Sequence, residues 1–264
     1  VGALNWNSRP VFISAGSTRT LGVVSSSSTI QPGETLVITH IPSVAELTSM
    51  RVVVPVNSLP VGATVTVLTT FLGGLPAPVS SQGRITLLGS GAGADISAGG
   101  AQPQRPVTIS FSYLPAALPA GTDVRRIVIG RHTASGWTLL PSTVDAANNT
   151  VTAQTNHFSV FAPLVSTPGT SLDSVQAFPI PWKPGSGDPQ FDAQGIAFTN
   201  LPEGGEIRIM TILGEEVKTL NAGPSGMALW NGVGSGGIRV GSGTYLVIVS
   251  GAGSRKVFRV AVVR

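Results

Sequence analysis

Short runs in which apolar and polar residues alternate recur along the whole chain. The clearest are Ala63–Thr69 and Val107–Tyr113, where Thr or Ser alternates with larger apolar side chains over most of the run. Such alternation is typical of a β-strand with one buried face and one solvent-exposed face. No stretch shows a sustained apolar period of about 3.6 residues, so the pattern predicts an all-β protein with almost no helix.

Gly, Pro and Asn residues punctuate these runs and place turns between the expected strands. Asp145–Asn149 is expected to be a turn, because asparagine takes positive φ at little steric cost. Gly89–Gly100 is interpreted as a glycine-rich loop interrupted by Ala94-Asp95-Ile96, and Leu114–Asp123 as a proline-bounded loop with room for one helical turn. The expected strands up to residue 164 are Val11–Ile13, Leu21–Val24, Thr35–Thr39, Arg51–Val56, Ala63–Thr69, Arg84–Leu88, Val107–Tyr113, Val124–Arg131, Trp137–Leu140, Thr150–Gln154 and His157–Ala162.

A segment rich in Ser, Thr, Pro and Gly divides the chain and predicts two β-sandwich domains. The first domain is expected to cover residues 1–164, with extra strands in 1–59, and residues 165–172 are interpreted as a linker. Residues 173–264 show turn signals about every ten residues, as sandwich domains do. The expected strands there are Val175–Pro184, Gly195–Thr199, Glu206–Ile212, Gly214–Val217, Met227–Trp230, Gly243–Ser250 and Lys256–Arg264.

Charged residues make up only 11% of the 264 residues, while 42% are hydrophobic. A surface with so little charge repels a neighbouring copy weakly, which favours self-association, although secreted sandwiches of this kind can also remain monomeric. The net charge of +4 is spread thinly. No basic run could follow a phosphate backbone, so nucleic-acid binding is not expected.

The chain has no cysteine, which excludes disulfides and thiolate metal sites. No window of about 18 apolar residues predicts a membrane span. The chain starts at Val1, which favours a processed form or a fragment of a longer protein. The apolar residues Val11, Phe12 and Ile13 are candidates for assembly, because such a strand can pair within its own domain or be donated to the sheet edge of a neighbour.

Residues 60–164 resemble the ZU5-like β-domains of bacterial surface proteins. The segments that carry the resemblance are Pro106–Tyr113, Ala117–Gly121, Gly136–Asp145, Thr150–Ala153 and His157–Ala162. The resemblance implies a β-domain of an extracellular or cell-surface protein.

Residues 172–264 resemble the immunoglobulin-like domain of the flagellar hook-cap family and the C-terminal sorting domains of type IX secretion cargo. The resemblance rests on Phe178–Pro181, Ile207–Val217, Trp230–Gly232, Ser242–Tyr245 and Lys256–Arg264. Ile180 and Asn231 depart from the usual Asn and Asp, which affects details of the turns rather than the fold. The resemblance implies an immunoglobulin-like sandwich and possible contact with secretion or anchoring machinery.

Several aromatic and glycine residues are expected to have structural roles. Gly214 is expected to take positive φ in a hairpin, and Trp230 to fill the core opposite Tyr245. The glycines that follow Trp230 do not precede a helix, so a phosphate-binding loop is not expected. The full set of structural residues is Trp137, Phe158, Phe161, Gly214, Trp230, Gly232, Gly243 and Tyr245.

The triplet His157-Phe158-Ser159 is the main candidate for chemistry. In some ZU5-like domains such a triplet cleaves itself between Phe and Ser, and this resemblance makes His157 the base and Ser159 the nucleophile. That chemistry needs a base within hydrogen-bond reach and a distorted peptide. The alternative, which we favour, is a strand in which Phe158 packs in the core while His157 and Ser159 share the other face.

No other residues form a convincing catalytic or metal-binding set. His40 and His132 are interpreted as solvated residues at strand ends. Asp188 and Asp192 loosely follow the alternation of a calcium loop but lack its remaining ligands and its glycine. No cofactor is implied.

These features predict a non-enzymatic, extracellular structural protein of a bacterial surface that assembles with its own copies into a filament, appendage or surface layer. A second possibility is cargo whose last domain is a sorting or anchoring signal. A third is an adhesin or carbohydrate-binding module, which would need an exposed aromatic platform from Trp6, Trp182 and Phe191.

Overall fold

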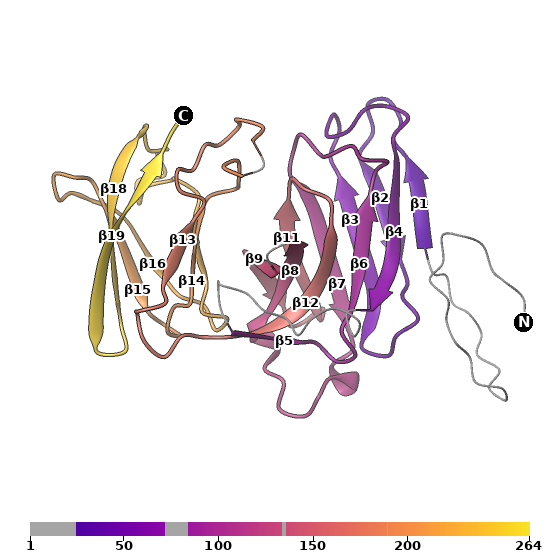
Figure 1. Ribbon diagram of the computed structural model, residues 1–264, viewed down its shortest axis with the longest axis horizontal. Helices are drawn as coiled ribbons and strands as arrows, with labels where there is room; N and C mark the ends of the chain where they lie inside the picture. The colour runs from indigo at the N-terminus through magenta and orange to yellow at the C-terminus, as the bar shows by residue number, and fades with distance from the viewer. Residues whose placement is uncertain (1–24, 72–83, 134–135, 189) are drawn as a thin grey trace, which may run out of the picture.

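The computed structural model describes residues 25–71, 84–133, 136–188 and 190–264. Nearly all regular structure in these ranges is antiparallel β-sheet, arranged in two halves that lie beside each other (Figure 1). The only helical segments among them are two 3-10 turns, η2 (Pro115–Ala117) and η3 (Val124–Arg126). The predicted all-β class with sandwich domains is confirmed. The expected strands Val11–Ile13 and Leu21–Val24 lie outside the described residues.

The N-terminal half contains a seven-stranded and a five-stranded sheet. The first has the order β1-β4-β6-β12-β8-β9, with β5 paired to β12, and the second the order β10-β11-β7-β3-β2. The strands of the first sheet are β1 (Ser25–Thr29), β4 (Thr64–Phe71), β5 (Arg84–Leu87), β6 (Ala92–Ser97), β8 (Ile127–Thr133), β9 (Gly136–Leu140) and β12 (Val160–Thr167). Those of the second are β2 (Leu36–His40), β3 (Leu47–Val54), β7 (Val107–Tyr113), β10 (Ser142–Asp145) and β11 (Thr150–Thr155).

Alternate side chains of these strands meet between the two sheets. Strand β7 shows the pattern most clearly, since Val107, Ile109, Phe111 and Tyr113 are all buried while the residues between them are half-buried. Residues from β4, β6, β8 and β12 close the same core from the opposite sheet. The period-two pattern of the sequence therefore specifies which face of each strand is buried.

The C-terminal half is a smaller sandwich with sheets of three and four strands. The orders are β13-β14-β17 and β16-β15-β18-β19. The strands are β13 (Gln176–Phe178), β14 (Ile196–Thr199), β15 (Glu206–Met210), β16 (Glu216–Asn221), β17 (Ala228–Trp230), β18 (Gly243–Gly251) and β19 (Ser254–Val262). Their inward residues form a separate core that includes Trp182, Phe198 and Trp230.

A third apolar cluster lies on the outer face of the seven-stranded sheet and joins the two halves. Val128, Trp137 and Leu164 contribute from β8, β9 and β12, and Met227 contributes from the C-terminal half. The side chains of this cluster pack so closely over β8 that a Cβ atom at Gly130 would lie 2.4 Å from Leu164 Cδ1. Glycine at this position therefore permits the close packing of the cluster.

The interpretation of Gly89–Gly100 as a loop is wrong for its central part. Residues Ala92–Ser97 form strand β6, which pairs with β4 and β12. A Cβ atom at Gly93 would lie 2.3 Å from the carbonyl oxygen of Phe161. The small residues thus serve close packing between strands rather than a flexible connection.

Several strand boundaries also differ from the sequence expectation, and one strand is additional. Residues 124–126 form the turn η3, so β8 begins only at Ile127. Strand β12 begins at Val160 rather than His157 and continues to Thr167, three residues into the range interpreted as a linker. Ser142–Asp145 forms an additional strand, β10, that pairs with β11.

The turn at Asp145–Asn149 is confirmed. Asn149 has a φ of 51°, and the Asp145 carboxylate accepts hydrogen bonds from the backbone amides of Ala147 and Asn148. The expected helical turn within Leu114–Asp123 is η2, between Pro115 and Ala117. Gly214, in the β15–β16 hairpin, has a φ of 90°, a conformation that glycine takes without steric cost.

Candidate functional site

The His157-Phe158-Ser159 triplet lies in the turn between β11 and β12 and not inside a strand. Phe158 is buried, and its backbone amide donates to the Gln102 side chain at 2.6 Å. The Ser159 hydroxyl donates to the backbone carbonyl of His132 at 2.8 Å. Within the described residues no hydrogen bond joins His157 to Ser159, so the hydroxyl is held by β8 rather than by the candidate base.

The environment of His157 disfavours a charged imidazole. Its Nδ1 atom is buried without a hydrogen-bond partner. Burial lowers the pKa of His157, and the nearby positive charge of Arg131 lowers that pKa further. The ring is neutral at pH 7, as a general base must be, but the geometry that would couple it to Ser159 is missing.

The other residues considered for ligand binding also make local contacts. The Asp192 carboxylate accepts hydrogen bonds from the amides of Gly185 and Gly187, and the Asp188 carboxylate accepts one from Gln190. These carboxylates thus organise a loop. In the described part of the chain, no three His, Asp or Glu side chains are grouped to hold a metal ion.

The aromatic platform expected of an adhesin is not formed by Trp182. This side chain is only 2% exposed, and its indole NH donates to the carbonyl of Ala193 at 2.7 Å. The Arg264 guanidinium covers the ring, and the Lys183 ammonium lies 4.7 Å from the Phe191 ring centre. Trp6 lies outside the described residues.

The histidines expected at solvated strand ends differ from each other. His40 is fully buried and contacts Ser26 and Thr69 through its two ring nitrogens, so that expectation is wrong for His40. His132 packs edge-on against Trp137 at a centroid distance of 5.2 Å.

The remaining structural candidates are distributed over all three apolar clusters. Phe158 and Phe161 belong to the N-terminal core, and Trp137 belongs to the cluster between the halves. Trp230 meets Tyr245 edge-to-face at 5.3 Å in the C-terminal core. Nothing in the surroundings of Gly243 explains a need for glycine, whereas a Cβ atom at Gly232 would lie 2.4 Å from the Trp182 ring.

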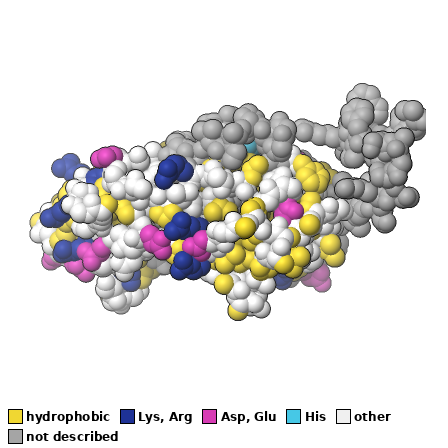
Figure 2. All heavy atoms as spheres, turned by 90° about the horizontal axis from the view of Figure 1, so that it is seen from below, with side chains coloured by type: hydrophobic (Ala, Val, Ile, Leu, Met, Phe, Trp, Pro, Cys, Tyr) yellow, Lys and Arg dark blue, Asp and Glu magenta, His cyan; other side chains and the backbone are white. Residues whose placement is uncertain are grey.

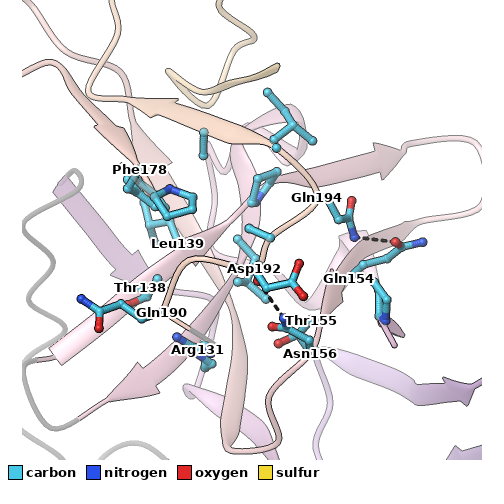
Figure 3. A pocket seen from close by; sticks show the side chains of 18 of the residues that line it. Arg131, Thr138, Leu139, Gln154, Thr155, Asn156, Phe178, Gln190, Asp192 and Gln194 are labelled. Carbon is cyan, nitrogen blue, oxygen red and sulfur yellow. Dashed lines mark hydrogen bonds between the residues drawn. The ribbon is translucent and has the colours of Figure 1, made fainter. Parts of the chain in front are cut away.

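A pocket of about 350 Å³ lies at the boundary between the two halves. Most of its lining residues come from β8, β9 and the end of β11 in the N-terminal half and from the 178–197 segment in the C-terminal half (Figure 3). Asn156 donates to the carbonyl of Asp192 at 2.7 Å, and Gln194 donates to Gln154 across the same boundary. The apolar part of the wall includes Leu139, Leu140, Pro141, Phe178, Pro179 and Leu229.

Arg131 is the cationic side chain of this pocket. It follows Ile127 and Ile129 on the inward face of β8, where the alternation would otherwise place a third core residue. Its Nε atom is buried without a hydrogen-bond partner, and burial lowers the pKa of Arg131. All twelve acidic residues of the sequence lie in the described ranges, and none is within ion-pair distance of Arg131.

Sequence reasoning did not identify this pocket, because its walls come from segments that are far apart in the chain. The one available signal was Arg131 itself, a charged residue at an inward position of an alternating strand. That signal marks an unusual residue but does not show which segment faces it.

Comparisons with known proteins give no family for this chain. No family model matches, and no curated protein matches. Among solved structures, the chain is similar to PorZ, described as a bacterial surface component of the type-IX secretion system of Porphyromonas gingivalis, with 14% identity and a TM-score of 0.32, over 86% of this chain and 38% of that one. It is also similar to dimeric latent PorU from the same organism, with 15% identity and a TM-score of 0.25, over 90% of this chain and 20% of that one.

The chain therefore spans well under half of these two proteins. At these identities and TM-scores, the two similarities assign no activity to this chain. Among the described residues, no helix is long and apolar enough to cross a membrane.

Proposed function

We propose that this chain is a non-enzymatic structural protein of a bacterial surface that assembles with further copies of itself through β-strand contacts. The observation that supports this most is the outer edge of β19, the last strand of the four-stranded sheet. A strand edge with free backbone groups is a template for pairing with another chain.

The hydrogen bonds of β19 define which of its residues face outward. The Ala261 carbonyl and the Val263 amide bond to the backbone of Trp182, on the side away from β18. The β18–β19 register continues without a shift from Gly251 to Gly243. In an antiparallel pair, outward-facing residues alternate, so the backbone groups of Val257 and Arg259 also face outward.

The charges on β19 favour one mode of assembly over another. Arg255, Lys256 and Arg259 lie on this strand, and it carries no acidic residue. Two β19 edges facing each other would bring like charges together, which is unfavourable. A head-to-tail contact with a different edge is therefore preferred, and repetition of such a contact produces an open filament.

A proline substitution tests this proposal. Val257→Pro removes an outward amide donor and blocks pairing at the free edge, yet leaves the inward bonds to β18 in place. We expect self-association of the purified protein to weaken at least about tenfold. Val257→Thr, which keeps the amide, is the matched control. Sedimentation over a range of concentrations and negative-stain electron microscopy provide the measurements.

A wild-type protein that remains monomeric at high concentration would contradict the assembly proposal. So would filaments that form equally well from Val257→Pro.

A second candidate is that the C-terminal half is a sorting or anchoring signal for the rest of the chain. The separate core of this half favours it, because a module that packs independently can act as an export address. Deletion of Leu172–Arg264 distinguishes the two functions. Loss of export with an intact N-terminal half supports the sorting role, whereas loss of polymerisation after normal export supports assembly.

A further inference from the structure

The pocket between the two halves contains a positive charge that the protein itself does not balance. Arg131 is half-buried and its Nε atom is enclosed without a hydrogen-bond partner, an arrangement that is costly because buried charges in proteins are normally paired. The carboxylate among the lining residues, that of Asp192, already accepts hydrogen bonds from the amides of Gly185 and Gly187. Arg131 is therefore available to an anion from outside the chain.

The shape and lining of the pocket restrict the kind of anion. Its volume of about 350 Å³ falls within the range of small-molecule sites. The apolar residues Leu139, Leu140, Phe178 and Leu229 contribute to the wall. A small hydrated ion would leave this surface uncovered, whereas a ligand with an apolar body would bury it.

We propose that the boundary pocket binds a small carboxylate with an apolar body, whose carboxylate pairs with the guanidinium of Arg131. A guanidinium presents its N–H donors in a planar fork that matches a carboxylate. Thr138 and Gln190 line the same pocket as Arg131 (Figure 3). Their hydroxyl and amide groups supply further donors for the carboxylate oxygens.

Both halves of the molecule contribute to this site. Arg131 and Leu139 lie on strands of the N-terminal half, while Phe178, Gln190 and Leu229 belong to the C-terminal half. A ligand that contacts both walls stabilises their association, because it binds only when the two halves are packed together. The carboxylate can come from a free acid or from the C-terminus of a polypeptide.

The test uses N-acetyl-leucine as the free acid and N-acetyl-leucinamide as its uncharged counterpart, with a tripeptide ending in leucine as the polypeptide source. Calorimetric titration of the full chain is expected to show binding of an acid and at least about tenfold weaker binding of the amide. Arg131→Gln should weaken binding of the acid by about 10- to 100-fold. Arg131→Lys should retain part of the affinity. Arg51→Gln, which removes an exposed arginine of β3, should bind as the wild type does.

Binding of the tripeptide alone would identify a chain end as the ligand, and binding of both acids would identify the free carboxylate as sufficient. Equal affinity for acid and amide, or unchanged affinity in Arg131→Gln, would overturn the proposal. Failure of both acids to bind would also overturn it.

A second measurement does not depend on the choice of ligand. If Arg131 serves to bind a ligand, its unpaired charge destabilises the ligand-free protein. Arg131→Met should therefore raise the Tm by roughly 2–4 °C. A lower Tm for Arg131→Met would assign Arg131 a structural role and contradict the inference. Carboxylate binding should also raise the pKa of His157 in an NMR titration, because the charge of Arg131 contributes to lowering it.

Discussion

The two halves of the molecule are both β-sandwiches with mainly aliphatic cores, but they differ in the size of their sheets and in the kind of aromatic ring in each core. The N-terminal core consists mainly of Val, Ile and Leu from strands of up to eight residues. The C-terminal half has a three-stranded sheet whose strands contain only three or four residues. Its core includes Trp182, Phe198 and Trp230. The aromatic rings of the N-terminal core belong to Phe and Tyr, whereas the C-terminal core contains two of the larger tryptophan rings.

The surfaces of the two halves also differ. Residues 166–264 contain eight basic and seven acidic residues, whereas the longer stretch 1–165 contains eight and five. Figure 2 shows charged side chains gathered over the C-terminal half and near the boundary, while the N-terminal half is mainly apolar or uncharged on that face. An ion pair between Arg126 and Glu203 connects the two surfaces. The C-terminal half therefore carries more charge for its length than the N-terminal half.

Truncation of one large aromatic in each half should have the largest effect. Trp230→Ala and Phe111→Ala each remove a fully buried ring, and each should lower the free energy of unfolding by about 3–5 kcal/mol. Calorimetry should show a different transition shifted by each variant, because the two rings belong to separate cores. A single transition shifted equally by both variants would show that the halves unfold as one unit.

Substitution at the boundary should have an intermediate effect. Gly130→Ala forces the Cβ atom against Leu164 and Trp137, which should destabilise the protein by about 1–3 kcal/mol. Gly236→Ala is the matched control, since nothing lies within 4 Å of a Cβ atom there and its φ is not positive. Chemical denaturation of both variants measures the difference. Equal stabilities would contradict close packing of Gly130 against Leu164 and Trp137 on the outer face of the seven-stranded sheet.

The smallest expected effect is a pH dependence specific to the N-terminal half. Burial lowers the pKa of His40 from its ordinary value of 6.5, so the folded state binds a proton less readily than the unfolded state. The free energy of unfolding should therefore be greatest above pH 6.5 and fall as the pH drops below it, by at most about 1.4 kcal/mol per pH unit for this group.

Comparison of histidine variants separates this contribution. His40→Gln should reduce the slope of stability against pH, while His157→Gln should leave the part due to His40 unchanged. The pKa of His157 is lowered as well, so the wild type carries both contributions with the same sign. A slope that persists unchanged in His40→Gln would rule out His40 as a source.

The alternation of apolar and polar residues was sufficient to predict most of the strands and their buried faces. The run Val107–Tyr113 forms β7 with the expected inward residues. Successive side chains of a strand point to opposite faces, so an apolar residue at every second position marks the buried face. The turn at Asn149 followed from the conformational preference of asparagine. By contrast, β6 was missed, since its small residues carry no propensity signal and are required by a neighbouring strand.

The candidate site was less predictable. The triplet at His157 was visible in the sequence, but the partner of Ser159 is a backbone carbonyl of His132, which no local pattern reveals. His40 looked like a solvated residue because the hydroxyls that contact it come from β1 and β4. The pocket around Arg131 required the packing of the two halves.

The sequence by itself determined that the protein is built from antiparallel strands, which residues face the cores, and that the surface carries little charge. These properties depend on neighbouring residues and on composition. The tertiary structure alone decided that Trp182 is covered, that the hydroxyl of Ser159 is held by β8, and that a lone arginine faces a pocket between the halves. Such properties depend on contacts between residues distant in the chain, and the packing of whole sheets brings them together.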